Sequence, residues 1–394
     1  MKFTPLMAFT VVMCFLFLGE WVSTRTRSYL PSIFISALLF VIGFWTVLPK
    51  TVVTMATFGD NFSAVVVGLL LVHLGTLMNL RQLAAQWKAI CIALVGVCGT
   101  LALTLTIGSF IFNWHTVVAA VPPLTGGLVA ALLMTNGLKA AGITTLVAIP
   151  VSMFIMHSLI GYPLTGWLLK KEGRRVISEY HAGNIQKTGQ FADDKKGVEE
   201  KGRFNKIPKA YRTPAFIIFK LGFVGALSYA VAALLHNVIN PNIFCLVFGV
   251  IFHQLGFLEG NALGKAGVTN WLIYGNLAYI FSQLSLTSPR TLATVILQIV
   301  VLIVLGVVGM FVASFLLHKP LHMSPYMAFA CSLTALFGFP ADYVLTTEVA
   351  RTVSTTKDEE EVVLENTLNP MLVGGFATVS VASVVIASIF LRLL

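Results

Sequence analysis

Charged residues are scarce in this sequence. Asp, Glu, Lys and Arg together make up 11% of the 394 residues, whereas apolar residues make up 57%. Soluble domains carry about a quarter charged residues, because their surfaces must face water. The composition therefore excludes an ordinary soluble fold and predicts an all-α membrane protein with many spanning helices.

The sequence also lacks the residue patterns of several functional classes. Its five cysteines lie in apolar stretches and none forms a C-x-x-C pair, so neither a disulfide framework nor a metal site is supported. There is no G-x-S-x-G, H-E-x-x-H or G-K-[ST] pattern, so neither intramembrane hydrolysis nor ATP-driven transport is indicated. We therefore expect a protein that is not an enzyme and that binds no organic cofactor.

Positive charge is concentrated in one segment. Between Lys170 and Arg212 lie twelve Lys or Arg and six Asp or Glu residues, which supply +6 of the net charge of +10. The segment has few aromatic residues and no recognisable nucleic-acid-binding module, so nucleic acid is not an expected partner. Lys and Arg accumulate in the cytoplasmic loops of membrane proteins, and we expect residues 169–213 to form such a loop.

Ten stretches are apolar and long enough to cross a bilayer, which takes about 20 residues. They lie at approximately 5–22, 29–48, 62–80, 89–112, 142–168, 215–236, 241–258, 268–286, 291–317 and 367–393. The start of the chain, Met1–Gly19, resembles a signal sequence, but no small-x-small cleavage site follows it. We expect it to remain as an uncleaved first helix.

Two further stretches, 116–140 and 321–350, are apolar but interrupted. The interruptions are Pro122-Pro123 and Gly126-Gly127 in the first, and Gly338-Phe339-Pro340-Ala341-Asp342 in the second. Backbone groups that are freed at membrane depth need protein or water around them. These stretches are therefore predicted to be two re-entrant hairpins rather than two ordinary spanning helices.

The two halves of the chain resemble each other at a constant spacing. The matches are Pro31-Ser32-Ile33-Phe34 with Pro241-Asn242-Ile243-Phe244, Arg81-Gln82-Leu83-Ala84 with Arg290-Thr291-Leu292-Ala293, and Leu124-Thr125 with Leu333-Thr334. The offsets are 210, 209 and 209 residues, in the same order. We interpret them as an internal repeat, with residues 1–168 as the first half and 214–394 as the second.

Loop charges predict how the repeats are oriented. If 116–140 enters from outside and returns, the first half crosses five times and its basic loops face the cytoplasm. The second half is then inverted, 321–350 enters from the cytoplasm, and both termini are extracytoplasmic. The acidic run Asp358–Glu361 is expected to be a solvated loop.

Interrupted segments at matching places in inverted repeats are the best sequence indication of a secondary transporter's binding site. Helix N-termini within the membrane favour anions, and unwound carbonyls can hold Na⁺. Gly126, Gly127 and Gly338 allow close backbone approach, and Thr125 and Thr334 offer hydroxyls at the same bends. The alternative is that these residues only shape or pack the helices, where Gly and Pro are common.

Three charged or polar residues near the interruptions are further candidates. Asp342 would cost roughly 2.5–3.5 kcal/mol at a helix centre, which a bound Na⁺ or a substrate ammonium could offset; alternatively it lies in water at the mouth of a loop. Asn136 offers a neutral oxygen ligand, or caps a turn. Arg351 could bind a substrate carboxylate, or marks a cytoplasmic helix end. His73, His157 and His253 are predicted to hydrogen-bond between helices, with a proton relay as the alternative.

The arrangement resembles the sodium/glutamate symporters and the related sodium-coupled citrate and 2-hydroxycarboxylate carriers. The resemblance rests on Leu124-Thr125-Gly126-Gly127, Gly338-Phe339-Pro340-Ala341, and Met371 with Gly374-Gly375-Phe376, and it covers about 29–168 and 215–393. It implies sodium coupling, an elevator-like motion and a homodimer. The sequence departs from the glutamate carriers in its poorer glycine runs and in Asp342, so glutamate is one candidate substrate among several.

These patterns together predict a secondary active transporter of a small organic anion, either a carboxylate or a glutamate-like amino acid, in the cell membrane. Na⁺ is the expected coupling ion, and the expected partners are the anionic substrate, membrane lipid and a second copy of the chain. The alternative is a proton-coupled carrier or an exporter of a different small solute. A channel would need continuous polar stripes or a charged ring, and a scaffold would need a folded loop; the sequence indicates neither.

Overall fold

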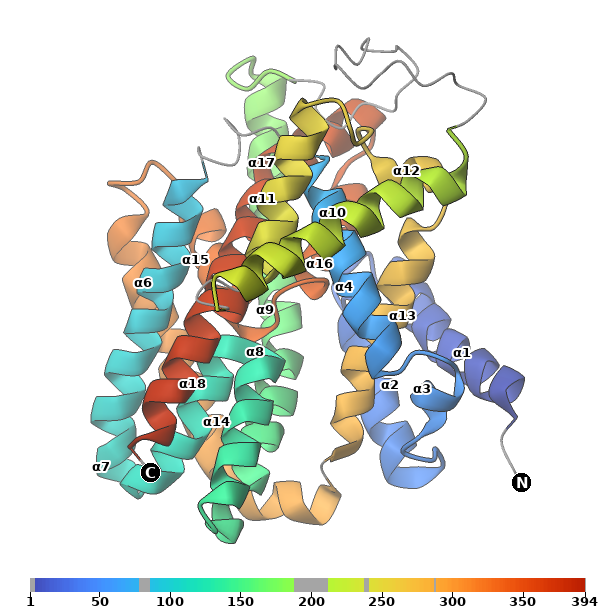
Figure 1. The fold of residues 1–394 in the computed structure, drawn as a ribbon. Helices are drawn as coiled ribbons and strands as arrows, with labels where there is room; N and C mark the ends of the chain where they lie inside the picture. Colours follow the sequence, from blue (N-terminus) through green and yellow to red (C-terminus); the bar gives the residue numbers. More distant parts are fainter. Residues whose placement is uncertain (1–3, 78–85, 188–211, 237–240, 287, 394) are drawn as a thin grey trace. The chain divides into compact units, whose positions relative to one another are not determined.

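The computed structural model describes residues 4–77, 86–187, 212–236, 241–286 and 288–393. Secondary structure within these ranges is entirely helical, with 17 α-helices and a few 3-10 and π segments (Figure 1). Five helices are long and apolar enough to cross a bilayer: α1 (Pro5–Arg25), Trp87–Ile111, α9 (Ala148–His181), α10 (Pro214–Leu234), and Leu292–Leu317 within α14 (Pro289–Leu317). The fold is that of a multi-span helical membrane protein.

The other elements are shorter or are interrupted. They are α2 (Ser32–Thr46), α3 (Val52–Met55), α4 (Asp60–Gly75), α6 (Trp87–Leu103), α7 (Ser109–Ile111), α8 (Trp114–Ala140), α11 (Pro241–Gln254), α12 (Ala262–Ala266), α13 (Thr269–Ser282), α15 (Pro325–Leu333), α16 (Ala341–Val353), α17 (Lys357–Gly375) and α18 (Ser383–Leu391). Two π-helical segments, η1 (Thr104–Gly108) and η6 (Phe376–Ala382), lie between α6 and α7 and between α17 and α18. 3-10 turns cover Thr144–Leu146, Gln283–Leu286 and Thr334–Leu336.

The chain divides into two compact units. Unit 1 comprises Met1–Phe9, Val53–Ala85 and Gly189–Tyr279, and unit 2 comprises Thr10–Val52, Gln86–Thr188 and Ile280–Leu394. Both interrupted segments that the sequence singles out, α8 and the α15–α16 region, therefore belong to unit 2.

In unit 1, α4 and α11 cross where each helix has a glycine. A Cβ added to Gly75 would lie 2.6 Å from the Val250 nitrogen, and one added to Gly249 would lie 3.1 Å from the Gly75 Cα. Small residues permit such close helix crossings in membranes. The Ser63 hydroxyl also donates to the Asn276 side-chain oxygen at 2.7 Å, which ties α4 to α13.

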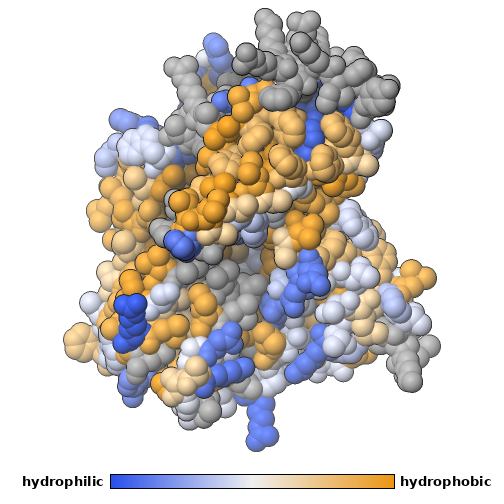
Figure 2. All heavy atoms as spheres, viewed as in Figure 1, coloured by the Kyte–Doolittle hydropathy of each residue, from blue (hydrophilic) through white to orange (hydrophobic). Residues whose placement is uncertain are grey.

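Unit 1 also presents a broad apolar surface along α10. Phe219, Phe223 and Leu234 are exposed large apolar side chains of this helix, and Figure 2 shows apolar residues covering the face on which α10 lies. Such a surface is typical of a helix that faces lipid.

In unit 2, α6 and α14 cross at Gly99 and Gly309. A Cβ added to Gly309 would lie 2.9 Å from the Thr100 nitrogen, and one added to Gly99 would lie 2.8 Å from the Ala313 Cβ. The two glycines are 210 residues apart, which matches the offset of the internal repeat that the sequence predicts. Each glycine therefore packs against the residue that lies one predicted repeat offset away.

A second pair of glycines on α6 and α14 has the same spacing. Gly96 on α6 faces the Ser332 side chain of α15, at 2.6 Å from an added Cβ, and Gly306 on α14 faces Leu124 of α8, also at 2.6 Å. Gly96 and Gly306 are 210 residues apart, and Leu124 and Ser332 are 208 apart. Each half of the chain thus supplies a glycine that receives the interrupted segment of the other half.

The α15–α16 segment folds back on itself along α9. Its start, Ser324, donates a hydrogen bond to Glu172, and its end, Val353, lies 2.9 Å from an added Cβ on Gly173. Its middle, at Leu336, instead lies against Gly161, twelve residues earlier on α9. The segment therefore runs down α9 and returns to the turn at which it started.

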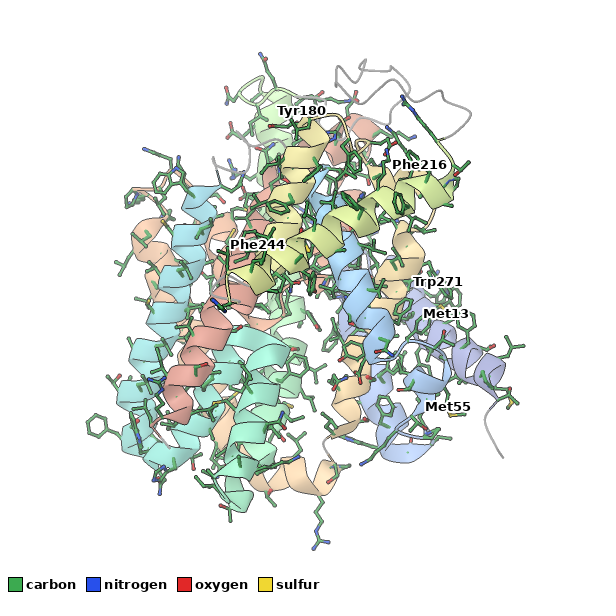
Figure 3. All side chains as sticks on the ribbon, in the orientation of Figure 1. Met13, Met55, Tyr180, Phe216, Phe244 and Trp271 are labelled. Carbon is green, nitrogen blue, oxygen red and sulfur yellow. The ribbon has the colours of Figure 1, made fainter. Side chains whose placement is uncertain are left out.

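Helix α8 also folds back, and it does so from the opposite end of unit 2. Gly108, which immediately precedes α7, faces Val117 near the start of α8, and Gly137 near its end faces Leu391, close to the C-terminus. In Figure 1, α7 and the C-terminus lie at one end of unit 2, and α9 ends at the other. Figure 3 labels Tyr180 at that second end, where α15 begins and α16 ends.

The structure differs from the sequence prediction in where the chain is helical. The acidic run was predicted to be a solvated loop, which is wrong: it forms the first turn of α17, where carboxylates favour the positive end of the helix dipole. Helix α9 continues to His181, beyond the predicted boundary at residue 168. Its extension packs Val176 against Ala350, Val362 and Val363, a buried cluster that also contacts Tyr180.

The start of α17 is held by a capping box. The Thr356 hydroxyl accepts from the Glu359 backbone, and Glu359 accepts in return from the Thr356 backbone. Hydrogen bonds from the hydroxyl and backbone of Thr355 are the main reason that the pKa of Glu359 falls to about 2. His181, at the end of α9, lies 3.0 Å from the same carboxylate.

Candidate functional site

Both interrupted segments break at a glycine in the left-handed region of the backbone map. Gly127 in α8 has φ 62° and ψ −144°, and Gly338 in the α15–α16 segment has φ 62°. Side chains with a Cβ rarely adopt these angles, whereas glycine does so readily. The helix continues through Pro122 and Pro123, so the glycine rather than the proline pair sets the break in α8.

The two breaks meet at one side chain, Val379. A Cβ added to Gly127 would lie 3.6 Å from Val379 Cγ1, and one added to Gly338 would lie 2.7 Å from Val379 Cγ2. Val379 lies in the π segment η6, between α17 and α18. π-Helical turns inside longer helices are frequent at functional sites. The structure thus brings Gly127 and Gly338 together around Val379, a residue that the sequence analysis did not predict as part of the site.

Gly126 and the two predicted threonines are buried beside these breaks. Gly126 faces Ser383 at the start of α18, with 2.8 Å between an added Cβ and the Ser383 Cα. Thr125 donates to the Pro122 carbonyl at 3.1 Å, and Thr334 donates to the Cys331 carbonyl at 2.6 Å. Because each hydroxyl donates to its own helix, only its oxygen lone pairs are available to a ligand.

Asp342 is fully buried at the start of α16. Its Oδ1 accepts from the Tyr343 backbone at 2.7 Å, whereas its Oδ2 has no hydrogen-bond partner among the described residues. A Cβ added to Gly375 would lie 2.5 Å from this Oδ2, so only glycine leaves room for the carboxylate. A buried carboxylate without a cationic neighbour is costly, and a ligand that carries a cation or a hydrogen-bond donor would offset that cost.

Helix α9 forms the wall on the other side of the second break. Gly161 faces Leu336 and Phe337, and the Tyr162 ring packs at a tilt of 50° against Phe337 with ring centroids 5.3 Å apart. Ser158 donates to the Leu336 carbonyl at 3.4 Å. The break is therefore enclosed by α9 on one side and by the glycines of α17 on the other.

Two predicted site residues lie away from this centre. Asn136 is exposed on the returning part of α8, nine residues beyond the break. The Arg351 side chain is 80% exposed, and its Nε lies 3.9 Å from Glu360. Arg351 follows Asp342 by nine residues of helix, or about 13 Å. The structure thus does not bring these two residues to the breaks.

The histidines divide into two kinds. His73 in α4 accepts from the Leu263 backbone at 3.2 Å, and His253 contacts the Leu258 carbonyl at 3.1 Å. His157 in α9 is fully buried, and neither of its ring nitrogens makes a hydrogen bond of acceptable geometry with a described atom. The prediction of a bond to another segment is thus confirmed for His73, and the His157 ring also faces another segment, at the Leu336 backbone.

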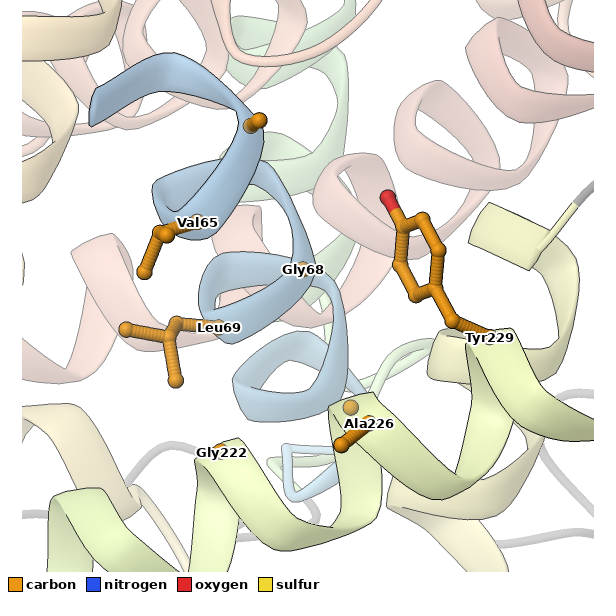
Figure 4. A pocket seen from close by; sticks show the side chains of 8 residues that line it. Val65, Gly68, Leu69, Gly222, Ala226 and Tyr229 are labelled. Carbon is orange, nitrogen blue, oxygen red and sulfur yellow. The ribbon is translucent and has the colours of Figure 1, made fainter. Parts of the chain in front are cut away.

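A pocket among the described residues lies elsewhere, in unit 1. It measures about 310 Å³ and lies between α4 and α10 (Figure 4). Its lining consists of glycine and aliphatic side chains and one aromatic side chain. The lining residues are Ala64, Val65, Gly68, Leu69, Gly222, Gly225, Ala226 and Tyr229. It contains no charged group that could recognise an ion, so the helix breaks, not this pocket, are the candidate site.

Comparison of the chain with protein-family models and with curated proteins finds no match. The assignment of the site therefore depends on its geometry alone.

Proposed function

We propose that this protein is a secondary active transporter that moves a small organic anion, a carboxylate or glutamate-like amino acid, across the cell membrane by symport with a cation. The observation that carries the proposal is the meeting of Gly127 and Gly338 at Val379. Two helix breaks that converge within a membrane fold leave backbone N–H and C=O groups free to bind a solute and its driving ion. Na⁺ is the driving ion that the resemblance implies.

The proposed topology has ten crossings and two re-entrant hairpins, arranged as inverted repeats. The contact between Gly99 and Gly309, which are one repeat offset apart, supports a two-fold relation between the halves. The opposite directions in which the α8 and α15–α16 segments open support the inversion. In this topology the 169–213 loop is cytoplasmic and both termini are extracytoplasmic.

The proposed mechanism is alternating access with an elevator-like motion. In that mechanism one rigid body carries the solute past another that stays fixed. The division of the chain into two compact units, one of which contains both breaks, supports this proposal.

A proton-coupled carrier is the second candidate. It is favoured by the unpartnered Asp342 Oδ2, because a buried carboxylate without a described cation beside it can be neutralised by a proton as well as by Na⁺. The two candidates differ in one measurable property, the gradient that drives uptake.

The test is uptake by purified protein in proteoliposomes, with a panel of labelled carboxylates and amino acids. Uptake is measured with a Na⁺ gradient, with a proton gradient, and with neither. Gly127→Val is the inactive control, and Gly222→Ala, where an added Cβ meets only Leu69 at 3.9 Å, is the matched glycine control. Gradient-independent leak in all three proteins would overturn the proposal in favour of a channel. No uptake of any panel compound by wild type would remove its support.

A further inference from the structure

The last turns of α9 carry basic side chains that make no ion pair with a described carboxylate. Helix α9 has 34 residues, so it is about 51 Å long and extends beyond a hydrocarbon core of about 30 Å. Lys171 and Arg174 are exposed in this part of the helix. The carboxylate nearest in sequence, Glu172, is buried and accepts instead from Arg175 and Ser324. The charges of Lys171 and Arg174 are therefore not neutralised by the described part of the chain.

The Lys171 ammonium is held against aromatic rings from two helices. Its Nζ lies 4.6 Å from the centre of the Trp167 ring on α9 and 5.6 Å from that of Tyr326 in the first turn of α15. Arg174 follows Lys171 by three residues and so shares its face of α9. Cation–π attraction orients an ammonium but leaves its charge available to an anion. Since Trp and Tyr are enriched at membrane–water interfaces, these rings indicate that the cluster lies at the level of the lipid headgroups.

An exposed apolar surface adjoins this cluster on α14. Phe311 of α14 packs edge-on against Phe329 of α15, with ring centroids 5.3 Å apart, so α15 runs back along α14. Phe315 lies four residues beyond Phe311, and Tyr326 lies three residues before Phe329. Phe315 and its neighbour Leu316 are therefore near the level of Tyr326. Both are exposed and belong to the apolar span Leu292–Leu317, so this surface suits acyl chains.

We infer that Lys171 and Arg174, together with the rings of Trp167 and Tyr326, form a binding site for a phospholipid with an anionic headgroup. The headgroup phosphate accepts from the ammonium and the guanidinium, which only donate. The acyl chains lie along the apolar surface of α14. A lipid uses both the charges and this surface, whereas a free phosphate uses the charges alone. The inference goes beyond the proposed function and does not depend on which solute is moved.

The test is the retention of lipid by the purified full-length protein, measured by native mass spectrometry. The protein is exchanged into detergent that contains equal amounts of phosphatidylglycerol and phosphatidylcholine. Because a basic side chain near a membrane surface contributes about 1 kcal/mol with anionic lipid, we expect Lys171→Gln to lower the ratio of retained phosphatidylglycerol to phosphatidylcholine about fivefold. Lys171→Arg should keep the wild-type ratio. Lys139→Gln is the matched control, since Lys139 is exposed on the returning end of α8.

Three results of this measurement would overturn the site. They are equal retention of the two lipids by wild type, an unchanged ratio in Lys171→Gln, and an equal fall in Lys139→Gln, which would show that only net charge matters.

A second measurement uses wild type alone, so it does not require a variant to fold. Phosphatidylglycerol with a photoactivatable group on one acyl chain is crosslinked to the protein in vesicles. We expect labelled peptides from the end of α14, the start of α15 and the α9 segment around Trp167. Labelling confined to other elements would contradict the inference. Loss of labelling in inorganic phosphate but not in chloride of equal ionic strength would assign the cluster to a free phosphate instead. Neither measurement involves transport, so the inference and the proposed function can fail separately.

Discussion

Gly99 and Gly309 pack face to face where α6 and α14 cross, each against the backbone of the other. Neither position has room for a methyl group, because the nearest atoms are backbone atoms that cannot move aside. We expect Gly99→Val and Gly309→Val each to destabilise the protein by about 1–3 kcal/mol or more, as overpacking does. Thermal unfolding of purified protein measures this, with Gly222→Ala as the control that should behave as wild type.

The glycines at the breaks should affect transport more than stability. A valine at position 127 or 338 would adopt a disfavoured backbone conformation, and at 338 it would also collide with Val379. We expect each variant to insert into the membrane but to lose uptake. Full uptake by both variants would show that Gly127 and Gly338 serve helix packing and not transport.

Asp342 should set the dependence of uptake on the driving cation. Asp342→Asn retains the shape and one oxygen but removes the charge, and carboxylate oxygen is the preferred ligand of hard cations. We expect a large rise in the Na⁺ concentration needed for half-maximal uptake, or loss of coupling to Na⁺. Uptake measured against Na⁺ concentration and pH tests this, and superimposable curves would exclude Asp342 from the site.

Glu359 should make stability depend on pH in an acidic window. The folded pKa is about 2, below the ordinary value of 4.5, so the carboxylate stabilises the folded protein fully above pH 4.5. That contribution is lost as the pH falls from 4.5 toward 2. We expect Glu359→Gln to lower stability at pH 7 by about 1 kcal/mol and to flatten this loss. Melting temperatures at pH 7, 5, 4 and 3 measure it, and Glu360→Gln should follow wild type.

The proposed topology predicts which loops can be labelled. Single cysteines in the 169–213 loop should be inaccessible to impermeant thiol reagents in intact cells and accessible in inside-out vesicles. Cysteines near either terminus should show the opposite pattern. Labelling of the loop from outside would contradict the inverted arrangement.

The class of fold was predictable because composition alone sets it: so few charged residues cannot cover a soluble surface. The glycines of the two breaks were predictable because they interrupt long apolar stretches, and backbone groups freed within a membrane must be held by protein or water. Val379 was not predictable, because a valine in an apolar helix has no pattern of its own, and its importance arises from a π turn that only the three-dimensional path reveals. The helical start of α17 was missed because four acidic residues suggest solvent more strongly than they suggest a capped helix.

His157 illustrates a different limit of the sequence. Nothing in the residue order distinguishes it from His73, since both are single histidines in apolar segments. They differ in geometry: the Leu263 N–H donates to His73 at 3.2 Å, whereas the Leu336 backbone lies beside the His157 ring without a hydrogen bond of acceptable geometry.

The single valine between the two breaks has an energetic consequence. Val379 lies against both breaks, 3.6 Å from an added Cβ on Gly127 and 2.7 Å from one on Gly338. In the proposed transporter, a ligand at one break that displaced Val379 would change the free energy of binding at the other break, and the change would be equal in both directions, as linkage requires. One aliphatic side chain would thereby give the binding of solute and of its driving ion a shared, reciprocal coupling energy.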